Sequence, residues 1–231
     1  MEKKLSKESH YTSRDYSYTC NDNMRSKYKQ SKWKKIRPIF CNSKNFDLKS
    51  RWKNVIDIKH LLDKINVPFF MSAGALLGIV RDGGFLPWDD DVDLDIFDNI
   101  FKKNYDEICE GLISLGFIVR GRNLSYKNSP AEKVNLYRKK EKVNIRGMYL
   151  QKDDKGNEYR RTSGYRFPSR FWDKTSTTIS FKGEIFNVPG PIEEYFIYNY
   201  GKNWKVPVKD KSICKKDWIK REISVPKKYR E

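Results

Sequence analysis

The chain has 231 residues and a formal net charge of +18, and this length predicts one folded domain with extensions. Its four cysteines are far apart and it has only two histidines, which excludes a disulfide framework and a zinc site built from Cys and His. No stretch is apolar enough to span a membrane and the charged N-terminus does not resemble a signal peptide, so we expect a cytoplasmic protein, with a membrane-peripheral one as the alternative.

The positive charge is concentrated at the two ends of the chain. Residues 1–50 hold 13 Lys/Arg against 5 Asp/Glu, and residues 202–231 hold 11 against 4. Residues 1–45 are also polar and aperiodic, which predicts a flexible basic extension before a domain at 46–205 and a basic tail at 206–231. Such ends are candidates for contact with an anionic surface, although solubility alone would also explain them.

Apolar spacing predicts the elements of the central domain. In chain order they are a helix at 46–65, a buried strand at 69–71, a small-residue turn at 72–75, a short helix at 76–80, a strand at 91–97, a helix at 100–115, strands at 117–120, 132–138 and 142–150, a hairpin at 177–186 and a helix at 192–200. Pro191 is expected at the first position of the last helix and Gly201 at its end. The order predicts a mixed α/β (α+β) domain with a small, largely antiparallel central sheet flanked by helices.

Five aspartates fall within seven positions at 89–95. On a strand, Asp91, Asp93 and Asp95 would share one face while apolar residues occupy the other. Like charges this close repel unless a cation lies between them, and Mg²⁺, with Mn²⁺ as the alternative, prefers such oxygen ligands. A solvated acidic turn is the simpler interpretation, but clustered acids are out of character in so basic a chain.

The segment just upstream has a compatible pattern. An apolar run at 69–71 is followed by small residues around Gly74 and then by an apolar helical segment. A strand, a small-residue turn and a helix N-terminus together favour phosphate binding, because free backbone N–H groups and the helix dipole attract anions. A phosphate-binding turn followed by a carboxylate strand suggests phosphoryl or nucleotidyl transfer.

Residues 74–81 (GALLGIVR) and 84–93 (GFLPWDDDVD) closely resemble the signature of the LicD family, which includes bacterial phosphocholine transferases, fukutin and fukutin-related protein. The resemblance covers roughly residues 50–205. It implies a nucleotidyltransferase-like fold and a Mg²⁺-dependent phosphotransferase. Such an enzyme would move a phospho-alcohol, phosphocholine or a polyol phosphate, from a CDP-linked alcohol donor to a glycan or glycoconjugate acceptor.

The resemblance also implies roles for the carboxylates. Asp91 and Asp93 would hold the metal, and Asp89 or Asp95 would complete the carboxylate set. One of these carboxylates would take the proton of the acceptor hydroxyl. Asn144 stands where the family often has a third carboxylate, and an amide is a poorer metal ligand.

The remaining candidate site residues would bind substrate. Gly74 and Ala75 of the turn, with Leu77 and Gly78 of the helix that follows, would bind phosphate, although Ala75 lacks the hydroxyl that the family usually has there. Two further candidates each have a structural alternative. Arg81 would supply a fixed positive charge or lie on the helix surface, and Trp88 would stack on a base or sugar or pack the turn.

Two other functions remain open from sequence. One is a different nucleotidyltransferase, acting on RNA, protein or a small molecule, which would share the same turn and carboxylates. The other is a catalytically decayed binding module, in which Ala75 and Asn144 would mark the decay.

Overall fold

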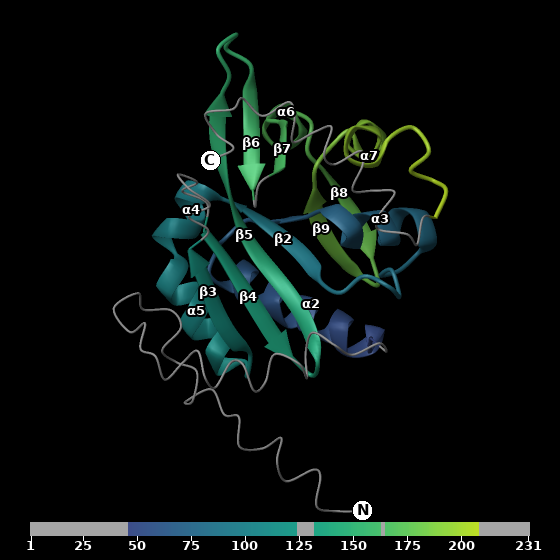
Figure 1. The fold of residues 1–231 in the computed structure, drawn as a ribbon. Helices are drawn as coiled ribbons and strands as arrows, with labels where there is room; N and C mark the ends of the chain where they lie inside the picture. Colours follow the sequence, from purple (N-terminus) through teal and green to yellow (C-terminus); the bar gives the residue numbers. More distant parts are fainter. Residues whose placement is uncertain (1–45, 124–131, 163–164, 208–231) are drawn as a thin grey trace, which may run out of the picture.

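The computed structural model describes residues 46–123, 132–162 and 165–207 (Figure 1). The predicted extension at 1–45 and all of the predicted tail except residues 206 and 207 lie outside this part of the chain. The helices and strands are α2 (Leu48–Lys64), β1 (Phe70–Met71), α3 (Ala73–Asp82), β2 (Val92–Phe97), α4 (Asp98–Lys103), α5 (Tyr105–Ser114), β3 (Ile118–Asn123), β4 (Glu132–Arg138), β5 (Glu141–Lys152), β6 (Glu158–Thr162), β7 (Tyr165–Pro168), α6 (Arg170–Asp173), β8 (Thr177–Phe181), β9 (Glu184–Val188) and α7 (Ile192–Tyr200).

These strands form one mixed sheet, and the predicted α/β fold class is confirmed. The main strand order is β3-β4-β5-β2-β1-β9-β8, and β6 and β7 extend from the far end of β5. Neighbouring strands are antiparallel except at two joins, β2 with β5 and β1 with β9. The sheet is therefore largely antiparallel as predicted, but with nine strands it is not the small sheet that we expected.

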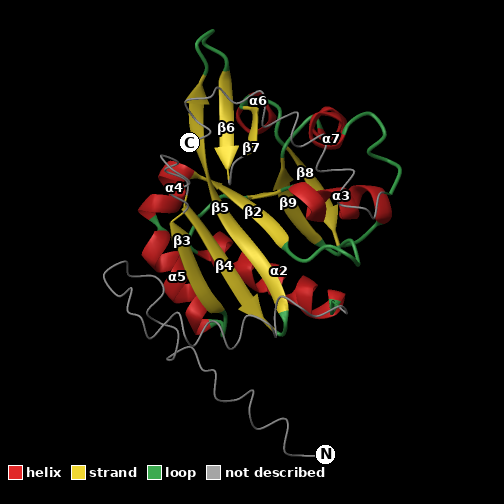
Figure 2. Ribbon diagram, viewed as in Figure 1, coloured by secondary structure: helices red, strands yellow, loops and turns green. Residues whose placement is uncertain are grey.

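Helices α2, α4 and α5 cover the apolar face of the sheet. In Figure 2 the red helices α2 and α5 lie behind strands β3, β4 and β5. Val92, Leu94 and Ile96 of β2 point into this layer and are at most 1% exposed. The side chain of Asp47 caps the N-terminus of α2, because it accepts hydrogen bonds from backbone N–H groups of the first turn that would otherwise lack a partner. The opposite, polar face of β2 is left to form the site.

A second group of elements closes the other end of the sheet. The β8–β9 hairpin pairs with β1, and α6 and α7 pack together with β7 through Phe167, Phe171, Trp172 and Tyr195. Neighbouring rings are 5.5–5.9 Å apart and mostly meet edge to face. This aromatic cluster fixes α7 against the strands beside the site.

The structure differs from the predicted elements in several places. Helix α3 begins at Ala73, three residues before the predicted start, and the predicted helix at 100–115 divides into α4 and α5 at Asn104. Pro191 is the residue before the first turn of α7, not the first helical residue. The β6–β7 hairpin was not predicted, because its strands are polar and show no apolar face. No helix in the described part of the chain is long and apolar enough to cross a bilayer.

Candidate active site

The carboxylate strand β2 places its acids on the polar face of the sheet. Asp93 and Asp95 alternate with buried apolar residues, and Asp91 immediately precedes the strand. The side chains of Asp91 and Asp93 are 22% and 17% exposed, whereas that of Asp95 is 1% exposed. The predicted shared face is confirmed, but the strand buries its third acid.

Strand β5 runs parallel to β2 and supplies partners for all three acids. Asp93 lies opposite Asn144 and Asp95 opposite Arg146. The amide nitrogen Nδ2 of Asn144 donates to Oδ2 of Asp91 and to Oδ1 of Asp93, each at 2.9 Å. Two carboxylate oxygens therefore converge on one point, which the Asn144 amide occupies.

Asp95 belongs to a buried network centred on Arg146. The Arg146 guanidinium donates from Nε to Asp95 Oδ1 at 2.7 Å and from Nη2 to Asp95 Oδ2 at 3.0 Å, and its Nη1 lies 2.8 Å from Asp93 Oδ2. The Ser72 hydroxyl accepts from Arg146 and donates to Asp95. Both oxygens of Asp95 are thus engaged, and its role in the structure is to hold Arg146 beside Asp93.

The two more exposed carboxylates differ in their charge environment. Burial opposes ionisation of Asp91, but the Lys142 ammonium, 2.6 Å away, together with the Asn144 amide and the Lys133 charge, lowers the pKa of Asp91 overall. Burial raises the pKa of Asp93 even though Arg146 opposes the shift, and the Asp91 charge adds to the increase. A cation beside Asp93 would remove this penalty.

The turn between β1 and α3 lies against the carboxylate loop. Ala73, the first residue of α3, has a left-handed backbone with φ of 52°, and its N–H donates to the hydroxyl of Tyr195 at 3.2 Å. A Cβ on Gly74 would collide with Oδ2 of Asp89, so a larger residue there would require the Asp89 side chain to move. The Asp89 carboxylate therefore sits at the first turn of α3, where the helix dipole favours negative charge. A donor phosphate at this turn would need the Asp89 side chain to rotate.

Helix α2 holds the loop that carries Asp89. Arg51 of α2 donates from Nη1 to the backbone carbonyl of Asp89 at 2.9 Å. Its Nε donates to Glu141, the first residue of β5, at 2.7 Å, and both side chains are 1% exposed. This buried ion pair links helix α2, strand β5 and the acidic loop.

The other predicted substrate-binding residues lie away from the carboxylates or in the core. Ala75 and Leu77 are 4% and 6% exposed, and Gly78 packs closely on the backbone of residue 84. Arg81 bonds to Asp82 and to the Trp204 carbonyl at the far end of α3, about 12 Å along the helix from Ala73. Trp88 is partly buried and packs against the core. Ala75, Leu77 and Gly78 therefore serve packing in the structure, and Arg81 links the end of α3 to Trp204.

Sequence reasoning missed several residues that the structure brings to the site. Lys142 and Arg146 flank Asn144 at a spacing of two, and that period could have placed them on its face of the predicted strand. Asp90 was not singled out, yet carboxylate oxygens of Asp89, Asp90 and Asp91 lie within 4.8 Å of one another. No sequence pattern marks Tyr195, which reaches Ala73 from 122 positions away.

The donor set fits the divalent cation that the sequence predicts. Asp91 and Asp93 offer converging oxygens, the hard ligands that Mg²⁺ prefers. Oδ1 of Asn144 is buried and has no hydrogen-bond partner among the described residues. Because an amide can turn by 180° about its last torsion, that oxygen can replace Nδ2 as the group facing the two carboxylates.

Comparisons with known proteins identify relatives of this chain. Ribitol-5-phosphate transferase FKTN of Macaca fascicularis is 32% identical over 153 residues and human FKTN is 31% identical, and the match covers 64% of this chain and 32% of each relative. Lipopolysaccharide cholinephosphotransferase LicD of Haemophilus influenzae is 38% identical over 42 residues, 18% of this chain and 16% of that protein. The chain thus spans about a third of the FKTN proteins that it matches.

The chain also resembles a solved structure and matches a family model. The lincomycin-bound lincosamide antibiotic adenylyltransferase LnuA superposes with a TM-score of 0.45 at 13% identity, covering 75% of this chain and 97% of that chain. The family model described as "LicD/FKTN/FKRP, nucleotidyltransferase domain" matches residues 66–191 and includes the turn, the carboxylate strand and β5. The chain therefore belongs to the LicD/FKTN/FKRP family.

Proposed function

We propose that this chain is a Mg²⁺-dependent phosphotransferase that moves a phospho-alcohol from a CDP-activated donor to a hydroxyl of a glycan. Its relatives are named for ribitol-5-phosphate and choline-phosphate transfer, which supports a phospho-alcohol as the transferred group. The observation that carries the proposal is the convergence of Asp91 and Asp93 oxygens on one point, beside the first turn of α3.

The transfer requires one bond to form and one to break. The acceptor hydroxyl oxygen attacks the phosphorus that carries the alcohol, and the bond from that phosphorus to the CMP oxygen breaks, so that CMP leaves. The hydroxyl proton passes to a carboxylate. Asp89 is the candidate for this step, because it lies on the loop between the α3 turn and the carboxylate pair.

Side chains of β2 and β5 would hold the cation. Asp91 and Asp93 are its proposed ligands, with the Asn144 oxygen after rotation of the amide. When bound, Mg²⁺ would neutralise charge on the phosphoryl oxygens and on the departing CMP. Arg146 keeps Asp93 in place from the opposite side, so the carboxylate is positioned before any ligand arrives.

The test is incubation of the purified chain with CDP-ribitol, CDP-choline, CDP-glycerol or the four NTPs, each with Mg²⁺ and with EDTA. Release of CMP is followed by chromatography, with a simple glycan as acceptor. We expect metal-dependent CMP release from one or more CDP-alcohols and none from the NTPs.

Other outcomes would replace the proposal. Metal-dependent consumption of NTPs with release of pyrophosphate would identify a different nucleotidyltransferase. Tight binding of a CDP-alcohol without turnover of any donor would identify a decayed binding module.

A further inference from the structure

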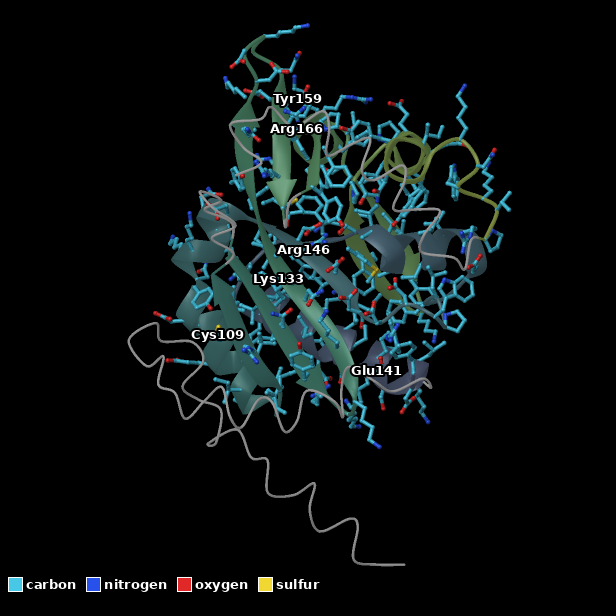
Figure 3. The ribbon with its side chains drawn as sticks, in the orientation of Figure 1. Cys109, Lys133, Glu141, Arg146, Tyr159 and Arg166 are labelled. Carbon is cyan, nitrogen blue, oxygen red and sulfur yellow. The ribbon has the colours of Figure 1, made fainter. Side chains whose placement is uncertain are left out.

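Three cationic side chains lie on the polar face of the sheet beside the carboxylate strand. Lys142 and Arg146 come from β5, and Lys133 comes from the next strand, β4. The register puts Lys133 directly opposite Arg146, which is itself opposite Asp95. Figure 3 labels Lys133 and Arg146, which lie near one another over these neighbouring strands.

Two of these cations are already engaged with the acids of the site. The Lys142 ammonium lies 2.6 Å from Asp91 Oδ2, and the Arg146 guanidinium bonds both Asp93 and Asp95. Each therefore neutralises and positions a carboxylate. Neither is available to a substrate unless a carboxylate is released.

Lys133 differs from the other two cations. Within the described part of the chain it forms no hydrogen bond or ion pair, although Asp93 and Asp91 are near enough to act on its charge. It is half-buried, and burial together with the nearby Lys142 and Arg146 charges lowers its pKa. An ammonium held in this environment is stabilised by any anion that supplies direct hydrogen bonds.

We propose that Lys133 binds the phosphate groups of the nucleotide donor. This inference rests on the proposed function. A cation at Asp91 and Asp93 would place the donor pyrophosphate over β2 and β5, and Lys133 would meet its oxygens from the β4 side. Lysine suits this contact because it acts as a point charge with three donors that can follow a phosphate as it moves.

The test compares three variants by calorimetry with CDP, cytidine and inorganic pyrophosphate as probes in the presence of Mg²⁺. Lys133→Met removes the charge and keeps the length, and Lys133→Arg keeps the charge. Lys102→Met is the control, since Lys102 is an exposed lysine on α4 that pairs with Asp98. Loss of a charge-assisted hydrogen bond should weaken CDP binding to Lys133→Met by at least about tenfold.

Cytidine binding should be equal in all four proteins, and Lys133→Arg should retain most of the affinity for CDP. A merely structural role would instead lower the melting temperature of Lys133→Met and leave the ratio of CDP to cytidine affinity unchanged. That result, or unchanged CDP binding in Lys133→Met, would overturn the inference.

The pyrophosphate titration distinguishes failure of this inference from failure of the proposed function. If wild type binds CDP no better than cytidine, the proposed donor is wrong. Pyrophosphate binding that Lys133→Met loses would then still support Lys133 as a phosphate-binding residue. Absence of pyrophosphate binding in wild type would overturn it as well.

Discussion

Replacing Asp95 with Asn should destabilise the domain strongly, because it removes the anion that holds a buried guanidinium. Asp95 and Arg146 are 1% and 7% exposed, and two parallel hydrogen bonds join them at 2.7 and 3.0 Å. An amide in place of the carboxylate would present an NH₂ group to one of these donors. The Ser72 hydroxyl would also lose its charged acceptor.

The expected magnitude follows from the burial of the pair. Breaking a buried ion pair by removing one partner costs about 3–5 kcal/mol. Arg146 keeps its contact with Asp93, so the lower end of this range applies. At 2–4 °C for each kcal/mol in a domain of this size, the melting temperature should fall on the order of 10 °C.

Scanning calorimetry at neutral pH measures this effect, with Asp63→Asn as the matched control. Asp63 forms an i,i+4 pair with Lys59 on the surface of α2, and its side chain is 52% exposed, so its loss should cost about 0.3–0.5 kcal/mol. If Asp95→Asn melts with the wild type, the network does not carry the stability assigned to it.

Three further predictions concern the site and the β5–β6 turn. Asp91→Asn or Asp93→Asn should reduce transfer by at least about a hundredfold in the CMP-release assay while the domain stays folded, and wild-type activity in either would refute the carboxylate assignment. Asn144→Asp should lower the melting temperature without metal, by repulsion, and tighten Mg²⁺ binding in calorimetry; equal Mg²⁺ affinity would mean that position 144 is not a ligand. The side chain of Asn157 and two backbone N–H groups donate hydrogen bonds to Asp153 and lower its pKa from the usual 3.8 to about 2. The stability that the ionised Asp153 contributes should therefore be full above about pH 4 and lost by about pH 2. The melting-temperature gap between wild type and Asp153→Asn should therefore close over that range, and a constant gap would contradict the reasoning.

Local periodicity predicted the faces of the sheet but not the partners of its charges. The spacing of two on β2 placed Asp91, Asp93 and Asp95 together, because alternation is a property of the strand itself. The pairing of Asp95 with Arg146 depends on the register of a strand 51 positions later, which no local pattern specifies. Sequence reasoning therefore offered Asp95 as an alternative ligand, whereas the structure shows it holding an arginine.

The start of α3 shows the same limit. Small residues at 72–75 favour a turn, and the sequence predicted the helix only from residue 76. The helix begins at Ala73, where the Tyr195 hydroxyl accepts the N–H of a residue in the left-handed region. This tertiary contact supports the boundary, and helix propensity alone does not indicate it.

The contact between Tyr195 and Ala73 also bears on how the domain is made by the ribosome. All the carboxylates and cations named for catalysis are synthesised by residue 146, yet β1 gains its second neighbour only with β9, and Ala73 gains its acceptor only with α7. Domains with such distant contacts complete late in synthesis. About fifty more residues must therefore be synthesised after the last of these reactive groups before Tyr195 can bond to the turn at Ala73.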